Sequence, residues 1–292
     1  MYDKNSSLKA CKVCKGNDIK FHFNVNNQNL WKCKICKFTF VEKKPTLSQL
    51  DKIYSETYFR NSKYGSYNLA MLKENQRRQK LLKSWAKNGA HVLDVGCSTG
   101  DFIRHVKDEY LTYGIDYSEF AIKEAIKKNP ELADNLKFGS IEKTDLGNRL
   151  FDIICLWDVI EHIWDPVKVI SDLFSRLKPG GGLMISTPAI DSFNARLLGR
   201  YWPFMTPPEH LSFLSRETFY KIASNLEECE LVYFSRKGKW ANLSFIAYKI
   251  SRVSPRWFPI KILSPFFKWP LRLISMYVPS GDIAYVVLKK SK

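Results

Sequence analysis

The chain has 292 residues, of which 45% are hydrophobic and 26% charged, and its formal net charge at pH 7 is +17. This length and composition fit a globular protein with one full catalytic domain and a small attachment, and they exclude a disordered or fibrous chain. The polar first residues lack the apolar core of a secretion signal, and charges and prolines interrupt the apolar stretch 257–279. We therefore expect a cytoplasmic protein with reduced cysteines.

The positive charge is concentrated at both ends of the chain. Residues 1–90 and 237–292 are strongly basic, whereas residues 91–236 carry a mild acidic excess. The basic ends are expected to face an anionic partner, and a phosphate-rich substrate, a membrane surface and a nucleic acid are the alternatives. Ordinary solvated lysines would explain the charge without a partner.

Four cysteines near the amino terminus have the spacing of a metal site. Cys11 and Cys14 are followed by Cys33 and Cys36 in a C-x2-C-x18-C-x2-C pattern. Two such pairs can place four thiolates tetrahedrally around one Zn²⁺, whereas paired disulfides are disfavoured in a reducing compartment. We predict a zinc ribbon over residues 1–45, in which the metal is structural. A helical linker or lid is expected over residues 46–88.

Short apolar runs alternate with helical patterns in residues 89–292. This alternation predicts an α/β domain, a doubly wound Rossmann-like sheet that is mostly parallel and binds its ligands at the carboxyl ends of the strands. Asp165 followed by Pro166 predicts the start of one of its helices. The seven expected strands are residues 91–95, 111–116, 136–139, 151–157, 182–187, 230–235 and 283–290.

A basic, aromatic-rich stretch precedes the last expected strand. Residues 237–281 are predicted to be an insertion in the sheet domain. Interleaved aromatic and cationic side chains suit an anionic membrane surface, to which the protein would attach peripherally. The alternative is a cap over the substrate pocket.

The loop after the first expected strand is rich in glycine. Gly96 and Gly100 allow the backbone to turn tightly before a helix, whose N-terminal amides attract anions. Asp116 ends the next strand, where a carboxylate can accept hydrogen bonds from ribose hydroxyls. A glycine-rich loop by itself is found in proteins that bind many different nucleotides, and Asp116 makes the pattern more specific.

Four motifs in order resemble the class I S-adenosylmethionine-dependent methyltransferases: VLDVGCSTGDF (92–102), YGIDYSEFAI (113–122), FDIICLWDVIEHIWDP (151–166) and LKPGGGLMISTP (177–188). The resemblance implies a seven-stranded methyltransferase sheet that binds S-adenosylmethionine. Asp116 would bind the ribose, and Ser140 and Ile141 would flank the adenine. Ser140 stands where many relatives have an acid. The other residues implied at the cofactor are Asp94, Gly96, Ser98, Gly100 and Trp157.

The cysteine ribbon and the PTLSQLDKIYSETYF segment (45–59) extend the resemblance to a bacterial subgroup that is associated with methylated sugars of surface polysaccharides and glycosylated natural products. It implies a small-molecule or glycan acceptor, and O-methylation is favoured. Transfer to a hydroxyl requires alignment and removal of its proton. The catalytic candidates are His210, in TPPEHLSFLS (206–215), and Asp158 and His162, which follow the fourth strand.

Three other functions are compatible with the sequence. An RNA methyltransferase could dock its substrate on the basic ribbon, although the Asn/Asp-Pro-Pro-aromatic signature of many base methyltransferases does not follow the fourth strand, and nucleic acid is therefore the less favoured partner. A quinone- or phenol-type O-methyltransferase could bind a divalent metal through Asp158, Glu161 and His162, but we favour a loop-anchoring role for Glu161 and His162. A non-catalytic nucleotide-binding adaptor is the last alternative.

Overall fold

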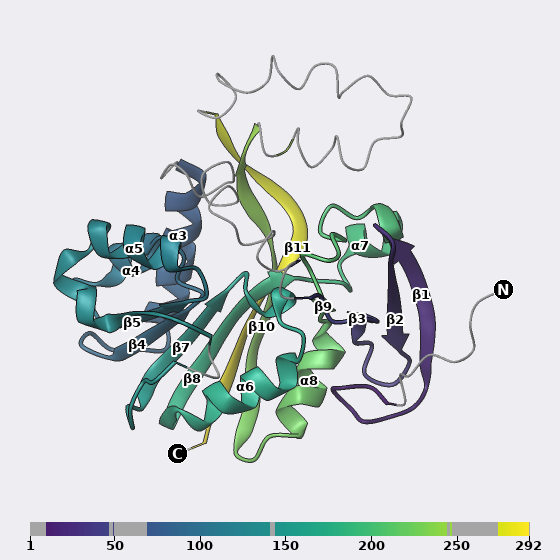
Figure 1. Cartoon of the computed structure of the whole chain (residues 1–292), viewed down its shortest axis with the longest axis horizontal. Helices are drawn as coiled ribbons and strands as arrows, with labels where there is room; N and C mark the ends of the chain where they lie inside the picture. The colour runs from purple at the N-terminus through teal and green to yellow at the C-terminus, as the bar shows by residue number, and fades with distance from the viewer. Residues whose placement is uncertain are drawn as a thin grey trace.

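The computed structural model describes residues 10–46, 49, 69–140, 144–243, 246 and 274–291. They form a large and a small β-sheet, with helices on both faces of the large one (Figure 1). Three predicted features lie wholly or partly outside the described residues. They are Ile141, the linker before Leu69 apart from residues 46 and 49, and the insertion at residues 244–245 and 247–273.

The large sheet has seven strands in the order β10-β11-β8-β7-β4-β5-β6. The pairs β6–β5, β5–β4, β4–β7 and β7–β8 are parallel, and β11 lies antiparallel between β8 and β10. This topology confirms the prediction of a doubly wound, seven-stranded Rossmann-like sheet. Its strands are β4 (His91–Val95), β5 (Leu111–Asp116), β6 (Leu136–Phe138), β7 (Phe151–Trp157), β8 (Leu177–Pro188), β10 (Cys229–Asn242) and β11 (Ser275–Lys290).

The last three strands of the large sheet in chain order are longer in the structure than the sequence pattern predicted. β8 begins at Leu177, because a bulge opposite β7 absorbs the glycine-rich residues between Leu177 and Gly182. β10 and β11 continue their antiparallel pairing as far as Asn242 and Ser275. Residues 237–242 and 275–281, which we predicted in an insertion, therefore extend the sheet as a two-stranded arm (Figure 1).

Helices cover both faces of the sheet and bury a separate core on each. α6 begins as predicted, with the Asp165 side chain accepting a hydrogen bond from the Lys168 amide and Pro166 in the first turn. The helices are α3 (Leu69–Lys83), α4 (Asp101–Val106), α5 (Glu119–Lys128), α6 (Pro166–Ser175), α7 (Phe193–Leu198) and α8 (Arg216–Ser224), with short 3₁₀ turns η1 (Pro130–Asn135), η2 (Ile160–His162) and η3 (Gly199–Tyr201).

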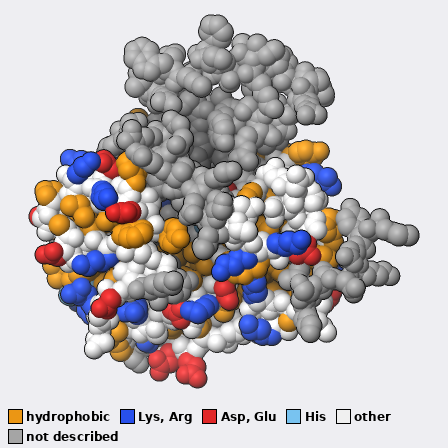
Figure 2. Space-filling view, in the orientation of Figure 1, with side chains coloured by type: hydrophobic (Ala, Val, Ile, Leu, Met, Phe, Trp, Pro, Cys, Tyr) orange, Lys and Arg blue, Asp and Glu red, His pale blue; other side chains and the backbone are white. Residues whose placement is uncertain are grey.

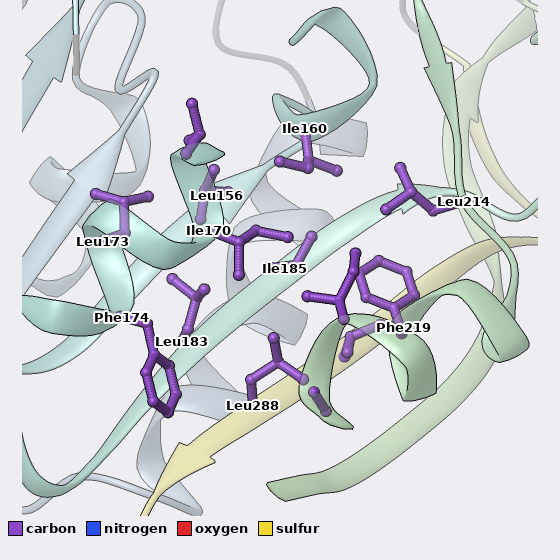
Figure 3. Close-up of a cluster of buried hydrophobic side chains, with 14 of the residues drawn as sticks. Leu156, Ile160, Ile170, Leu173, Phe174, Leu183, Ile185, Leu214, Phe219 and Leu288 are labelled. Atoms are coloured by element: carbon purple, nitrogen blue, oxygen red, sulfur yellow. The ribbon is translucent and has the colours of Figure 1, made fainter. Parts of the chain in front are cut away.

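On one face, α6 and α8 pack on the central strands. Figure 3 shows Leu173 and Phe174 of α6 and Phe219 of α8 above Leu183 and Leu288 of the sheet. These side chains are at most 5% exposed. On the other face, α3 and α4 pack on β4, β7 and β11 in a second core. The two layers fix the carboxyl edge of the sheet, where the candidate site lies.

The amino-terminal ribbon is joined to the large domain through a shared sheet. Its strands are β1 (Ile19–Val25), β2 (Gln28–Cys33) and β3 (Thr39–Val41), and β3 pairs with β9 (Ser212–Phe213) of the large domain. Three side-chain bonds reinforce the contact: Thr218 Oγ1 donates to Cys36 O, Asn225 Nδ2 to Val13 O, and Asn26 Nδ2 to Pro207 O. These bonds hold the ribbon in a fixed position against the large domain.

Basic side chains are distributed over the described surface. Figure 2 shows Lys and Arg side chains interspersed with acidic and hydrophobic ones on this face, both over the large domain and over the ribbon. Within the ranges that the structure describes, no helix combines the length and apolar character needed to cross a bilayer.

Candidate functional site

The glycine-rich loop after β4 is tied to the end of β5. The amides of Gly96 and Cys97 donate to Ile115 O, and the Ser98 amide donates to Asp116 Oδ2 at 2.8 Å. Gly96 has a φ of +72°, and a Cβ there would lie 2.5 Å from Val159 Cγ2. Because of this close approach, glycine is required where the loop passes the segment after β7.

Several buried polar atoms around this loop are suited to a polar ligand. Asp94 Oδ1, Ser98 Oγ and Trp157 Nε1 find no hydrogen-bond partner among the described residues. Burial raises the pKa of Asp94 to about 7, although the charge of Arg78 opposes the rise. Unpaired buried polar atoms are costly, and a bound molecule with hydrogen-bonding groups would satisfy them. The residues present therefore fit a cofactor of the S-adenosylmethionine type.

Asp116 lies where the sequence placed it, at the carboxyl end of β5. Its two oxygens accept bonds from the amides of Ser98 and Ser118, each at 2.8 Å. Burial raises its pKa and these two bonds oppose the rise. Each carboxylate oxygen keeps a lone pair for a second donor such as a hydroxyl. Ser140 follows the end of β6 on the same edge, because β6 pairs with β5 in parallel.

Asp158, at the end of β7, is held by two cations. Its Oδ2 lies 3.1 Å from Arg78 Nη2 and 2.9 Å from Lys239 Nζ, and its Oδ1 accepts a bond from Ser186 Oγ. Burial alone would raise its pKa, but Lys239 and Arg78 outweigh burial and hold the pKa well below its ordinary value. A carboxylate stabilised in this way is a poor proton acceptor, and the catalytic role that the sequence suggested for Asp158 stays a prediction.

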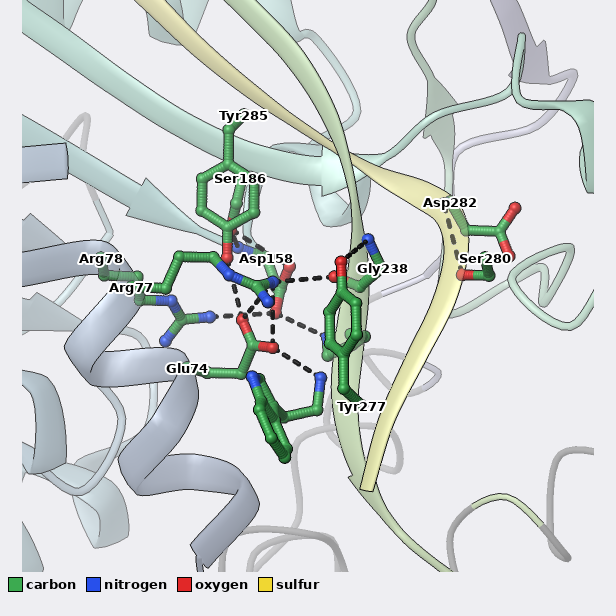
Figure 4. A network of polar contacts seen from close by, with 12 residues as sticks. Glu74, Arg77, Arg78, Asp158, Ser186, Gly238, Tyr277, Ser280, Asp282 and Tyr285 are labelled. Carbon is green, nitrogen blue, oxygen red and sulfur yellow. Dashed lines mark hydrogen bonds and ion pairs between the residues drawn. The ribbon is translucent and has the colours of Figure 1, made fainter. Parts of the chain in front are cut away.

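Glu74 joins the same network from α3 (Figure 4). Its carboxylate accepts bonds from Tyr285 Oη at 2.9 Å and from the Trp240 amide at 2.6 Å, and it pairs with Arg77. Arg77 also donates to Gly238 O. The network connects α3, β7 and the β10–β11 arm, and it closes one side of the candidate site.

His162 and His210 lie together on the other side of the β7 end. His162 Nδ1 is 2.8 Å from Glu209 O, and His210 Nδ1 is 2.7 Å from Phe204 O. A carbonyl can only accept, so both Nδ1 atoms carry the proton in the neutral rings, and Nε2 is then the basic nitrogen of each ring. The ring centroids are 4.9 Å apart.

Glu161 completes this cluster. Its side chain accepts a bond from Thr187 Oγ1, and burial together with the charge of Asp158 raises its pKa to about 8. Each of Glu161, His162 and His210 offers one possible metal-ligand atom, and these three atoms lie within 4.8 Å of one another. The cluster forms because the Leu211 amide donates to Glu161 O and Ser212 Oγ donates to Ile163 O.

The four ribbon cysteines converge as a zinc site requires. Cys11 Sγ is 3.6 Å from Cys36 Sγ, and Cys14 Sγ is 3.5 Å from Cys33 Sγ. Disulfide sulfurs lie about 2.05 Å apart, whereas sulfurs at about 2.3 Å from a tetrahedral Zn²⁺ lie about 3.8 Å apart. The thiols are free. The donor set and spacing fit a structural Zn²⁺.

The two cysteine turns have the same backbone geometry. The Lys15 amide donates to Cys11 O and the Lys37 amide donates to Cys33 O. Lys15 and Lys37 both have a φ near +60°. Two equivalent turns facing one another give four thiolates on one centre.

Sequence reasoning missed Arg78, Lys239 and Glu74. Arg78 and Glu74 belong to a basic, polar helix that was expected as a linker, and Lys239 was assigned to the insertion. Their pairing depends on contacts across 80 residues or more, for which the sequence carries no local signal. The lack of an apolar stripe on 69–83 was the one available hint that its polar side chains face something other than solvent.

A family model described as a methyltransferase domain matches residues 67–226. The chain is 31% identical over 103 residues to a probable S-adenosylmethionine-dependent methyltransferase of Mycolicibacterium smegmatis, a match that covers 34% of this chain and 38% of that protein. It is 35% identical over 102 residues to the ubiquinone biosynthesis O-methyltransferase of Coxiella burnetii, with coverage of 34% and 44%. The chain thus spans less than half the length of these curated relatives.

Among solved structures, the N-methyltransferase NodS of Bradyrhizobium japonicum, crystallised with S-adenosyl-L-homocysteine, is similar in fold. The TM-score is 0.51 at 14% identity, and the superposition covers 84% of this chain and 98% of NodS. At this identity, the similarity supports the fold alone.

Proposed function

The chain belongs to the methyltransferase-domain family, and we propose that it transfers the methyl group of S-adenosylmethionine to a hydroxyl of a sugar or glycan precursor. The observation that carries the proposal of O-methylation is the His162–His210 pair, in which backbone carbonyls orient both rings beside the end of β7 and make Nε2 the basic nitrogen of each. A hydroxyl acceptor must lose a proton during transfer, and a positioned imidazole is the side chain best suited to take it near neutral pH.

The cofactor would be held by the residues at the carboxyl edge of β4, β5 and β7. Asp116 would accept bonds from the ribose hydroxyls, and Asp94, Ser98 and Trp157 have the unpaired buried atoms described above. Gly96 and Gly100 would leave room for the amino-acid part, with Ser140 and Ile141 near the adenine. Bound S-adenosylmethionine supplies an electrophilic methyl group, and the electron pair of the broken carbon–sulfur bond stays on sulfur.

In this proposal His210 Nε2 accepts the acceptor's hydroxyl proton as the new oxygen–carbon bond forms. The Nδ1–H of His210 is fixed on Phe204 O, which orients the ring and keeps Nε2 unprotonated. His162 and Glu161 would orient the acceptor. Asp158 would keep Arg78 and Lys239 in place beside the cofactor, because its carboxylate is already bound to both cations.

A quinone- or phenol-type O-methyltransferase is the second candidate. The specific observation in its favour is that Glu161, His162 and His210 bring their ligand atoms within 4.8 Å of one another. A divalent cation there would be bound by two imidazoles, each oriented by a carbonyl, as metal-binding histidines usually are. The name of the Coxiella relative agrees with this alternative. Methyl transfer that requires added divalent metal and prefers a catechol would favour it.

RNA methylation and a non-catalytic adaptor role are less well supported. β7 is followed by Asp158-Val159-Ile160 and not by the Asn/Asp-Pro-Pro-aromatic signature of many base methyltransferases. An adaptor would not need two oriented histidines at the methyl-transfer edge. Contact of residues 237–281 with an anionic membrane stays a prediction.

The test is to incubate the full chain with methyl-labelled S-adenosylmethionine and separate pools of nucleotide sugars, lipid-linked glycans, phenols and RNA. We expect labelled O-methyl sugar from one of the first two pools, and no label from an Asp116→Ala variant. Label that appears only in RNA or only in phenols would contradict the proposed acceptor. Failure to bind S-adenosylmethionine in calorimetry would contradict every methyltransferase function.

A further inference from the structure

A cavity of about 400 Å³ lies at the junction between the ribbon and the large domain. Lys44 and Pro45, which follow β3, form one wall, and residues from His162 to Lys168 form the other. Since His162 lines it, the cavity adjoins the histidine pair. A molecule bound there would reach the side chains that we propose to handle the acceptor's proton.

The charge of the cavity is positive. Lys44 and Lys168 line it, and Lys12 lies behind Trp164, with Nζ 3.2 Å from the centroid of a Trp164 ring and donating to Trp164 O at 2.9 Å. Two lysines therefore line a space in which Asp165 is the one acidic group among the described lining residues. Asp165 is engaged as the cap of α6, where its side chain accepts a hydrogen bond from the Lys168 amide.

The start of α6 also favours an anionic ligand in the cavity. The helix begins at Pro166 beside the cavity, so the positive end of its dipole lies near Lys44 and Lys168. Lys168 also pairs with Asp172 at 2.7 Å, but this is an exposed pair on one helix face, which a bound anion can outcompete. Lysines are common phosphate ligands because they act as compact point charges.

Trp164 gives the cavity an apolar wall. The indole is held in place from the ribbon side by Lys12, and it lines the cavity. A ring of a sugar or a base can pack on such a surface while its charged group contacts the lysines. Aromatic and cationic groups together thus suit a small phosphorylated molecule with a ring.

We propose that this junction cavity binds the acceptor through a phosphate group, and that the ribbon contributes to the acceptor site by supplying Lys44 and Pro45, with Lys12 holding Trp164 in place. This inference rests on the proposed function, since it names the class of acceptor for the same reaction. It gives the zinc-stabilised ribbon a direct role in substrate binding and requires no separate nucleic-acid partner.

The test is calorimetric titration of the full chain with pyrophosphate and with uridine diphosphate, while S-adenosylhomocysteine saturates the cofactor site. We expect the double variant Lys44→Gln/Lys168→Gln to bind pyrophosphate roughly tenfold more weakly or worse, with unchanged affinity for S-adenosylhomocysteine. The matched control is Lys123→Gln/Lys127→Gln on α5, whose side chains are 67% and 71% exposed. The control should leave both affinities unchanged.

Two single variants sharpen the result. Asp165→Asn removes the one carboxylate yet keeps a good helix cap, so it should bind pyrophosphate more tightly without loss of stability. Trp164→Ala should weaken uridine diphosphate and leave pyrophosphate nearly unchanged.

Three outcomes would overturn the inference: absence of saturable binding of either probe at millimolar concentration, equal loss of binding in the α5 control, or tighter binding of glucuronate than of glucose 1-phosphate. If S-adenosylhomocysteine still binds in these cases, the proposed function survives. If S-adenosylhomocysteine does not bind, the proposed function itself fails.

Discussion

The imidazole rings of His162 and His210 cross edge to face with their centroids 4.9 Å apart, and each donates its Nδ1–H to a backbone carbonyl. The two residues come from different connections of the fold, η2 after β7 and the loop before β9. Backbone and side-chain bonds from Leu211 and Ser212 to the η2 segment hold these connections together. Two imidazoles that are each held by a backbone carbonyl are suited to proton transfer or to metal binding.

The first prediction separates these two uses. His210→Gln should lower kcat by about 10²- to 10⁴-fold while the affinity for S-adenosylmethionine stays the same, because Gln cannot accept the proton. The residual rate should rise with pH as the acceptor hydroxyl ionises by itself. His105→Gln on α4 is the matched control and should be fully active. Methyl-transfer kinetics from pH 6 to 10 measure both effects.

A metal at the cluster would give a different result. In that case a chelator would abolish wild-type activity, a divalent cation would restore it, and Glu161→Gln would be as damaging as His210→Gln. That outcome would replace the proposed base by the second candidate function.

The second prediction concerns the pH dependence of stability. The pKa of Asp94 is raised from an ordinary 3.8 to about 7 in the folded chain. The folded state therefore favours the protonated form of this carboxyl group. The stability that the group contributes is fully present below pH 3.8 and is lost as the pH rises towards 7. Asn cannot ionise, so Asp94→Asn does not have this loss. Its free energy of unfolding relative to the wild type should therefore rise with pH by up to about 4 kcal/mol, at roughly 1.4 kcal/mol per pH unit.

The measurement is urea unfolding of the cofactor-free chain at pH 4, 5.5 and 8. The free energy of unfolding of Asp94→Asn minus that of the wild type should increase with pH over this range. Asp134→Asn, at an exposed position of η1, is the control and should show a constant difference. A difference for Asp94→Asn that does not change with pH would refute the role of burial at this carboxyl group.

The sequence predicted the sheet well because its strands have strong local signals. The strands that end at Val95, Asp116 and Trp157 have the predicted bounds, since each is an apolar run followed by turn or loop residues. Glycines marked the loop after β4 because Val159 leaves no room for a side chain at Gly96. Signals of this kind act within a few residues.

The charged side of the site had no such signal. Arg78 and Lys239 meet at Asp158 only because α3 and the β10–β11 arm pack on the same end of the sheet. The junction cavity likewise requires the pairing of β3 with β9, which joins the ribbon to the large domain. These are products of tertiary packing, and a lysine that will be buried looks in sequence like one that will be solvated.

The third prediction tests the zinc site. The purified chain should contain one zinc per chain by elemental analysis, and Cys36→Ser should contain much less and lose the ordered ribbon, because three thiolates hold the metal weakly. Cys229→Ser, which removes a lone half-buried thiol, is the control and should keep its zinc. If the denatured, metal-free wild type shows fewer than its seven thiols, disulfides rather than zinc hold the ribbon.

The last prediction addresses the network around Asp158. Lys239→Met keeps the aliphatic length of the side chain but leaves Asp158 with Arg78 as its one described cationic partner, so a partly buried negative charge loses half of its compensation. Because the Lys239 side chain is still 28% exposed, solvent limits the loss to about 1–3 kcal/mol of unfolding free energy. Lys237→Met is the matched control: it lies two residues earlier on β10, is exposed, and should change stability little.

The same pair of variants reports on the role of Asp158. Lys239→Met should also raise the KM for S-adenosylmethionine more than it lowers kcat, because the network orders Arg78 beside the unpaired Asp94 rather than touching the acceptor. Unfolding by urea and steady-state kinetics give the two readouts independently. A Lys239→Met variant that is as stable as Lys237→Met would refute the electrostatic role of Lys239. One that loses kcat alone would show that Asp158 acts on the acceptor, as the sequence first suggested.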